Sequence, residues 1–140
     1  MPETSPKAVF KTHEGMVDGH RAVVTVNHTL KDLVGKAWCP WHLTINILLD
    51  DELPSNDEEE ALSQLEDDLH LLVGRVCEDF DYVGRVTVNG LRQIHFYLDA
   101  PEAAHEALTA TIENGMPKEV DHLLAYDPHW AEVDHLFDDA

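Results

Sequence analysis

The side chains with the clearest chemical potential are the ten histidines of this 140-residue chain. His42, His95 and His122 each fall in a predicted strand, and the fold inferred below makes the three strands neighbours. If Leu123 and Ala125 face the helices, the three imidazoles share one face of the sheet and can bind zinc or another divalent ion. The register of the strands can also place the three imidazoles more than about 10 Å apart along the sheet. They are then part of a solvated polar face. We expect the polar face and no cofactor, with metal at the three histidines as the alternative.

Sequence strings typical of well-known enzymes are missing. The chain has no G-x-S-x-G, no Walker A string, no G-x-G-x-x-G and no H-E-x-x-H. His13-Glu14 followed by His20 has the wrong spacing for that zinc motif. Cys39 and Cys77 form no C-x-x-C pair and predict no disulfide framework. We therefore expect no catalytic residues.

The charge limits the possible partners. The chain has 28 acidic and 9 basic residues, a formal charge of −19. Such a chain is repelled by nucleic acid and by anionic membranes, and it is attracted to basic protein surfaces. Ten carboxylates lie between Asp50 and Gly74 without a lysine or arginine. The candidate partner-binding residues are Glu58, Glu59, Glu66 and Asp67. The alternative is acidity that serves solubility alone.

Length and apolar content predict one domain over residues 1–140, with residues 1–7 disordered. The N-terminal sequence lacks the apolar stretch of a signal peptide. No segment approaches the ~18 apolar residues of a membrane-spanning helix. We expect a cytoplasmic protein with reduced thiols.

The segment that fixes the fold is the run from Tyr82 to Leu98, in which two β-rich stretches flank Asn89-Gly90. This dipeptide favours a type I′ turn, because both turn positions need positive φ. A two-residue loop fixes the pairing, which continues unbroken until Tyr82 faces Tyr97. Alternation gives a core face of Ile94, Phe96 and Leu98 and a second face of Gln93, His95 and Tyr97.

Other elements follow from periodicity and from turn residues. Leu62, Leu65, Leu69 and Leu72 recur at helical spacing, and Ser55 or Asn56 can cap that helix. We also expect Asp99 to cap a second helix with Pro101 in its first turn. The predicted elements are a short strand at 8–11, a turn at 14–19, strands at 21–27 and 41–49, helices at 56–77 and 99–114, a strand at 120–126 and helical turns at 129–137.

From residue 41 to residue 126 the order is strand, helix, strand, strand, helix, strand. This is the split βαβ or ferredoxin-like pattern. It predicts an α+β fold, a βαββαβ sandwich with both helices on one face of an antiparallel sheet. The strand at 21–27 extends the sheet at an edge, as an extra N-terminal strand or hairpin.

Several strings resemble the bacterial domain-of-unknown-function 695 family over roughly residues 38–135. They are Pro40-Trp41, the ALSQLEDDL helix, the G-x-V-T-x-N-G-x-R-x-x-x-F-Y hairpin at 84–97 and the D-P-x-W string at 127–130. The resemblance implies a ferredoxin-like domain with no established activity or catalytic residues. It also implies a distant, fold-level similarity to the ribonuclease E inhibitor protein B.

We therefore expect a non-catalytic binding or regulatory module that docks on a basic protein surface. Ribonuclease inhibition and toxin neutralisation are specific forms of this function. The alternative is a metal-dependent or small-molecule enzyme that uses the histidine-rich sheet face. A third hypothesis is a structural accessory domain.

Overall fold

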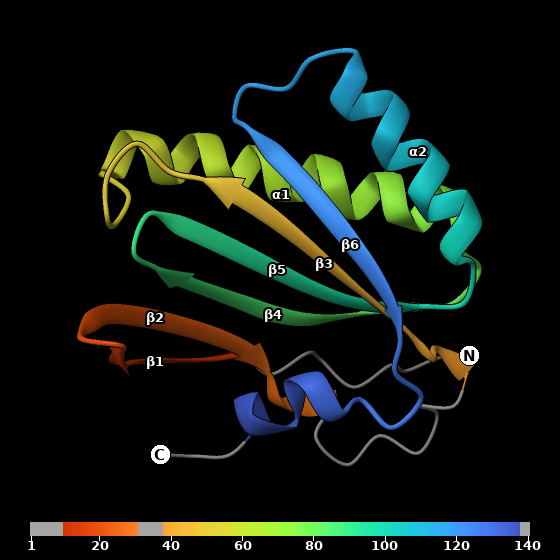
Figure 1. Cartoon of the computed structure of the whole chain (residues 1–140), viewed down its shortest axis with the longest axis horizontal. Coiled ribbons are helices and arrows are strands. Elements are labelled where there is room, and N and C mark those ends of the chain that lie inside the picture. Colours follow the sequence, from red (N-terminus) through yellow and green to blue (C-terminus); the bar gives the residue numbers. More distant parts are fainter. Residues whose placement is uncertain (1–9, 31–37, 138–140) are drawn as a thin grey trace, which may run out of the picture.

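The computed structural model describes residues 10–30 and 38–137. They form a six-stranded antiparallel sheet in the order β1-β2-β4-β5-β3-β6 (Figure 1). The predicted disorder at 1–7 lies outside this part of the chain. The elements are β1 (Phe10–Val17), β2 (His20–Asn27), the 3₁₀ turn η1 (His28–Leu30), β3 (Trp41–Leu48), α1 (Asn56–Val76), β4 (Phe80–Val88), β5 (Leu91–Leu98), α2 (Pro101–Glu113), β6 (Val120–Tyr126) and the 3₁₀ helix η3 (Ala131–Phe137).

The α+β prediction is confirmed, together with the βαββαβ order from β3 to β6. Both helices cover one face of the sheet (Figure 1). Strand β2 does not form the edge, because β1 pairs with its outer side and makes an N-terminal hairpin. The edges of the sheet are therefore β1 and β6.

The predicted turn at 14–19 is wrong. Strand β1 continues to Val17, and Asp18-Gly19 alone form the turn, with φ of 51° and 82°. These values match those of Asn89-Gly90, 50° and 79°, so both hairpins use two-residue turns with positive φ. Extended backbone at 14–17 is favoured because β2 offers it a complete pairing edge.

The predicted pairing of β4 with β5 holds from the turn to Gly84. A bulge follows, and Tyr82 lies opposite Phe96 instead of Tyr97, so the last predicted pairs are wrong. At Gly84 the backbone approaches β2 so closely that a Cβ atom would lie 2.2 Å from the Thr25 carbonyl oxygen. The bulge turns Tyr82 toward the helices.

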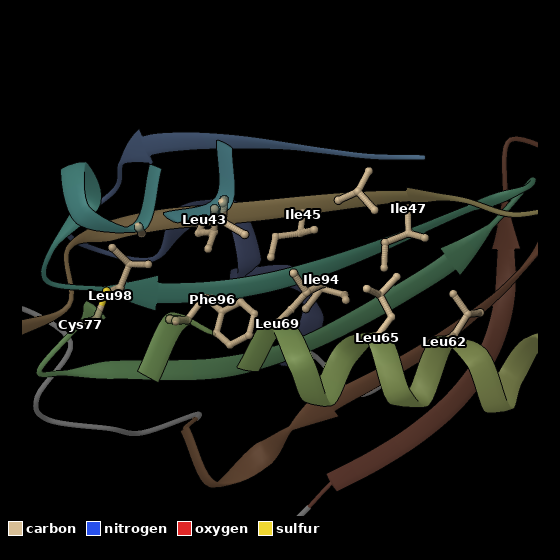
Figure 2. Packing of buried hydrophobic residues seen from close by; sticks show 14 residues of the cluster. Leu43, Ile45, Ile47, Leu62, Leu65, Leu69, Cys77, Ile94, Phe96 and Leu98 are labelled. Carbon is tan, nitrogen blue, oxygen red and sulfur yellow. The ribbon is translucent and has the colours of Figure 1, made fainter. Parts of the chain in front are cut away.

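Helix α1 begins as predicted, with the Ser55 side chain accepting a hydrogen bond from the Glu58 N–H. Its leucine stripe packs against β3 and β5, as Figure 2 shows for Leu62, Leu65 and Leu69. The predicted stripe is confirmed, with Leu72 half-buried at its margin. No helix of the described ranges is long and apolar enough to cross a membrane.

Helix α2 starts with Pro101, but its N-cap residue is Ala100, which makes no side-chain capping bond. The predicted Asp99 cap is wrong, because the Asp99 carboxylate accepts the Asp79 N–H instead, at 3.2 Å. The predicted end is confirmed, with Gly115 at φ 103° just after the helix.

Candidate functional site

The sheet face opposite the helices, predicted to be open, is covered around Tyr97 by the C-terminal segment, whereas Leu123 of β6 on the same face is 65% exposed. The Tyr97 ring is fully buried and stacks on the Trp130 ring at 4.3 Å between centroids. The Trp130 indole N–H donates to the Cys39 carbonyl at 3.0 Å. Val133 and Leu136 of η3 pack into the same cluster. These apolar side chains give the sheet a second core, because their 3₁₀ helix places them against it.

His42 and His95 form a buried pair on this second face. Nε2 of His42 lies 2.9 Å from Nδ1 of His95, and the His42 ring also stacks on Tyr97. Burial lowers the pKa of His95 to about 3, with repulsion from His42 adding to the shift. Burial also lowers the pKa of His42, against the attraction of Asp127 and Glu132. Both rings are therefore neutral at pH 7.

Asp127 joins the sheet to the C-terminal segment. Its carboxylate accepts the Tyr97 hydroxyl at 2.6 Å and the Ala131 and Glu132 N–H groups at 3.0 Å. Burial acts to raise the pKa of Asp127, but these hydrogen bonds lower it below the ordinary value. A cavity of about 360 Å³ opens beside Asp127, His42 and Glu132. The buried cluster thus holds the segment on the sheet and leaves His42 at the end of a small cavity.

His122 lies on the other face of the sheet. In the β3–β6 pairing it is opposite Ile45, and Leu123 is opposite Thr44. Leu123 and Ala125 therefore lie on the same sheet face as His42, away from the helices. The three imidazoles could share a face only if Leu123 and Ala125 faced the helices, so that expectation is wrong. In the described part of the chain, no group of three or more histidine, cysteine or acidic side chains is arranged to hold a metal ion.

The enzyme alternative depended on an open, histidine-rich face. The structure brings together His42 and His95 and buries both, while His122 contacts His105 of α2 instead, with Nε2 and Nδ1 3.0 Å apart. The predicted constellation of His42, His95 and His122 is therefore not formed.

The four candidate acidic residues occupy different environments. Glu58 is buried, forms an ion pair with Lys118 and accepts the Asp50 N–H at 2.9 Å. Its carboxylate holds the loop before α1 to the segment before β6. Glu58 is therefore part of the fold and not of an exposed acidic surface.

Glu66 and Glu59 form ion pairs with arginines of β4 and β5. Glu66 pairs with Arg85 at 3.0 Å and with Arg92 at 3.2 Å, and it accepts the Tyr82 hydroxyl at 3.3 Å. The Arg92 side chain is 3% exposed and also pairs with Glu59, at 3.1 Å. Such a buried cation needs its carboxylates, because a buried charge without a partner is costly.

Asp67, the fourth candidate, lies exposed on the outer side of α1. Beside it, a cleft of about 400 Å³ opens between α1 and the strands. Phe10, His70 and Tyr82 contribute rings to this cleft, and Arg85 lines it together with Glu66, with which it pairs. Asp67 therefore remains as the carboxylate that suits the cationic end of a lysine or arginine side chain.

A family model described as "Family of unknown function (DUF695)" matches residues 11–137. The chain belongs to this family. The DUF695 match includes most of the N-terminal hairpin, beyond the range 38–135 expected from the resemblance. It also includes the C-terminal segment, so the DUF695 unit contains both layers that cover the sheet. Comparisons with curated proteins and with solved structures give no match.

Two of the predicted acidic residues of α1 are exposed in this DUF695 member: Asp67, and Glu59, which pairs with Arg92. Three further residues, Asp57, Glu60 and Asp68, lie with Asp67 on the helix side opposite the leucine stripe. The same three-and-four spacing that identifies the buried stripe also identifies this outer side, so the sequence contained the signal. The pairing of His105 with His122 gave no such signal, because it depends on how α2 packs on β6.

Proposed function

We propose that this chain is a non-catalytic binding module that docks on a basic protein surface through the outer side of α1. The carrying observation is the division of the helix carboxylates between two sides. Glu58 neutralises Lys118 and Glu66 neutralises the buried Arg92, whereas Asp57, Glu60, Asp67 and Asp68 remain exposed. We call these four exposed residues the outer acidic face.

The internal ion pairs preserve the negative electrostatic field of the outer acidic face. Arg85, Arg92 and Lys118 all point toward carboxylates of α1 or the loop before it, so their charges do not oppose it from solvent. The rest of the chain adds to the negative field, since its formal charge is −19. Such a field accelerates encounter with a basic partner, and salt weakens it over ~10 Å at 0.1 M.

Two further features suit a protein partner. Leu71 lies on the same side of α1 and is 61% exposed, which provides an apolar contact among charges. The cleft beside Asp67 is lined by the rings of Phe10, His70 and Tyr82. We infer that a lysine or arginine of the partner pairs with Asp67 beside this cleft. Inhibition of a basic ribonuclease and neutralisation of a basic toxin are two forms of this function.

The test uses a photo-crosslinking amino acid at Gln64, which is exposed near the middle of the outer acidic face. Source-cell proteins are crosslinked at low and high salt. One variant neutralises the outer acidic face as Asn or Gln. The control neutralises four exposed carboxylates on other segments: Glu78, Glu113, Glu119 and Asp134. Both variants change the net charge equally.

We expect a crosslink to a basic protein that weakens with salt, disappears in the outer-face variant and persists in the control. Equal loss in both variants would show that net charge alone attracts the partner. Unchanged crosslinking in the outer-face variant, or none from Gln64 in the unmodified face, would reject docking there and favour solubility as the role of the acidity.

A further inference from the structure

Strand β6 forms one edge of the sheet, and within the described residues it pairs with β3 alone (Figure 1). The Leu48 N–H donates to the carbonyl of Glu119, which directly precedes β6, at 3.0 Å. Because hydrogen-bonding groups alternate along an antiparallel strand, the odd-numbered residues of β6 bond to β3. The backbone N–H and C=O groups of the even-numbered residues, such as His122 and Leu124, therefore point to the free edge.

The sequence of β6 does not protect this edge. Edge strands are commonly shielded by a lysine, a proline or a bulge, because free backbone groups pair with other chains. The seven residues of β6 contain no lysine or proline, and their pairing with β3 is unbroken. Leu123 and Tyr126 of the strand are both about two-thirds exposed. Such an apolar edge is suited to pair with an added strand.

A cavity flanks β6 on each face of the sheet. On the helix side, a groove of about 580 Å³ lies between α2 and the strand, with Trp41 and Leu124 in its apolar wall. A hydrogen bond between the rings of His105 and His122 holds α2 beside β6. The cavity of about 360 Å³ on the other face is lined in part by Ala125 of β6. Successive side chains of an added strand point to opposite faces and therefore enter the two cavities in turn.

The charges around the edge select a basic occupant. Glu102 and Glu106 line the groove beside α2, and Asp127 and Glu132 line the cavity on the other face. Among the described residues, no lysine or arginine lines either cavity. A second copy of the chain is a poor occupant, because each copy carries a formal charge of −19 and α2 has three glutamates and no lysine or arginine. A basic segment is favoured for the same reason.

The two cavities differ in what they offer a side chain. On the helix side, the aliphatic stem of a lysine can lie along Trp41 and Pro101 while its ammonium group reaches Glu102 or Glu106. On the other face, the exposed Leu123 offers an apolar contact. The edge therefore suits a strand in which basic and apolar side chains alternate, with the basic ones toward α2.

We propose that β6 binds an extended segment of a basic protein, which adds to the antiparallel sheet as a seventh strand. Main-chain hydrogen bonds to β6 supply affinity, and the alternating side chains supply specificity. The site uses β6 and α2, so it is separate from the outer acidic face of α1. Its test does not depend on docking at that face.

The probe is an end-blocked peptide of alternating lysine and valine, which begins and ends with lysine and has the seven-residue length of β6. One modified peptide carries backbone N-methyl groups on its two middle lysines, which removes the donors that face β6. The matched peptide carries them on two valines, whose N–H groups point away from β6 in an antiparallel pair. All three peptides have the same charge, so they differ only in their capacity to pair.

Binding to the full-length chain is measured by calorimetry, and amide exchange is followed by NMR. The edge variant is Leu123→Lys, and its control is Met16→Lys, which adds the same charge at an equally exposed position of the opposite edge strand. A second variant combines Glu102→Gln with Glu106→Gln. Its control combines Glu14→Gln with Asp18→Asn in the exposed β1–β2 hairpin.

We expect one unmodified peptide to bind per chain, and the valine-methylated peptide to bind with similar affinity. The lysine-methylated peptide should bind more weakly by about tenfold or more, because it loses two hydrogen bonds. Bound peptide should slow amide exchange at His122 and Leu124, whereas Leu123, already bonded to β3, should change little. Leu123→Lys and the double glutamine variant should weaken binding, and their controls should not.

Four results would count against the site. Equal binding of the two methylated peptides would show that charge alone attracts them and would overturn strand addition. Unchanged exchange at His122 and Leu124 would place the peptide elsewhere. Full affinity in the double glutamine variant would overturn the role of the α2 carboxylates. A dimer of the unliganded chain that Leu123→Lys dissociates would assign the edge to a second copy.

Discussion

The two faces of the sheet bury polar groups in opposite ways. On the helix-covered face, the buried guanidinium of Arg92 is paired with the carboxylates of Glu59 and Glu66. On the other face, His42 and His95 are kept neutral, and the Tyr97 hydroxyl donates to Asp127. On the helix-covered face, the buried guanidinium stays charged because carboxylates pair with it. On the other face, burial keeps the imidazoles uncharged. Polar residues at alternate strand positions therefore do not by themselves indicate an open face.

The largest expected effect tests whether the second face is a true core. Trp130→Ala should lower the free energy of unfolding by about 3–5 kcal/mol, since it removes a fully buried ring and the donor to Cys39. Trp38, which is 73% exposed, provides the matched control, and Trp38→Ala should stay within about 0.5 kcal/mol. Denaturant unfolding measures both. Similar small losses would show that the second face contributes no core.

Two leucine variants, one buried and one exposed, test which side of α1 faces the sheet. Leu69→Ala should cost about 2–5 kcal/mol, because Leu69 is 1% exposed between α1 and the sheet. Leu71→Ala removes the same atoms from an exposed position two residues later and should cost little. If the two variants unfold at the same denaturant concentration, the assignment of the buried side of α1 is wrong.

The third comparison separates inner from outer carboxylates. If the four candidates Glu58, Glu59, Glu66 and Asp67 were all exposed, neutralising them would relieve self-repulsion and leave the stability equal or greater. The ion pairs predict the reverse for Glu66→Gln, a loss of about 1.5–3 kcal/mol, as expected for hydrogen bonds to charged groups. Asp67→Asn should be within about 0.5 kcal/mol of the unmodified chain. A Glu66→Gln protein as stable as Asp67→Asn would contradict the ion-pair network.

The smallest expected effect is a pH dependence from the second face. The folded-state pKa of His95 is lowered to about 3, so the unfolded chain binds the proton first as pH falls below about 6.5. Stability should therefore decrease by about 2 kcal/mol between pH 7.5 and 5, at ~1.4 kcal/mol per pH unit once below 6.5. Unfolding curves across this range measure the loss. His95→Gln should flatten the dependence, whereas the exposed His129→Gln should leave it steep.

Features set by local chemistry could be predicted from the sequence. Asn89-Gly90 forms the turn because few other residues accept positive φ at both positions. The leucines of α1 are buried because helical spacing aligns them on one side. From these elements, the βαββαβ order follows directly.

Features that depend on distant partners could not be predicted. The bulge at Gly84 depends on the approach of β2, and the side of β6 that faces the helices is ambiguous because Leu123 and Leu124 are both apolar. Lys118 is 60 residues from the glutamate that it neutralises. Trp130 reaches a carbonyl 91 residues earlier, so nothing near His42 or His95 in sequence indicates that they are covered.

The most direct test of a closed second face is a pH titration of the imidazole signals by NMR. The structure predicts that the His95 signals stay at their neutral positions from pH 7.5 to 5, because burial holds its pKa near 3 and His42 occupies the adjoining nitrogen. A midpoint for His95 near 6.5, the ordinary value for a solvated histidine, would show that this face is open to water. That result would contradict the account and restore the exposed histidine surface.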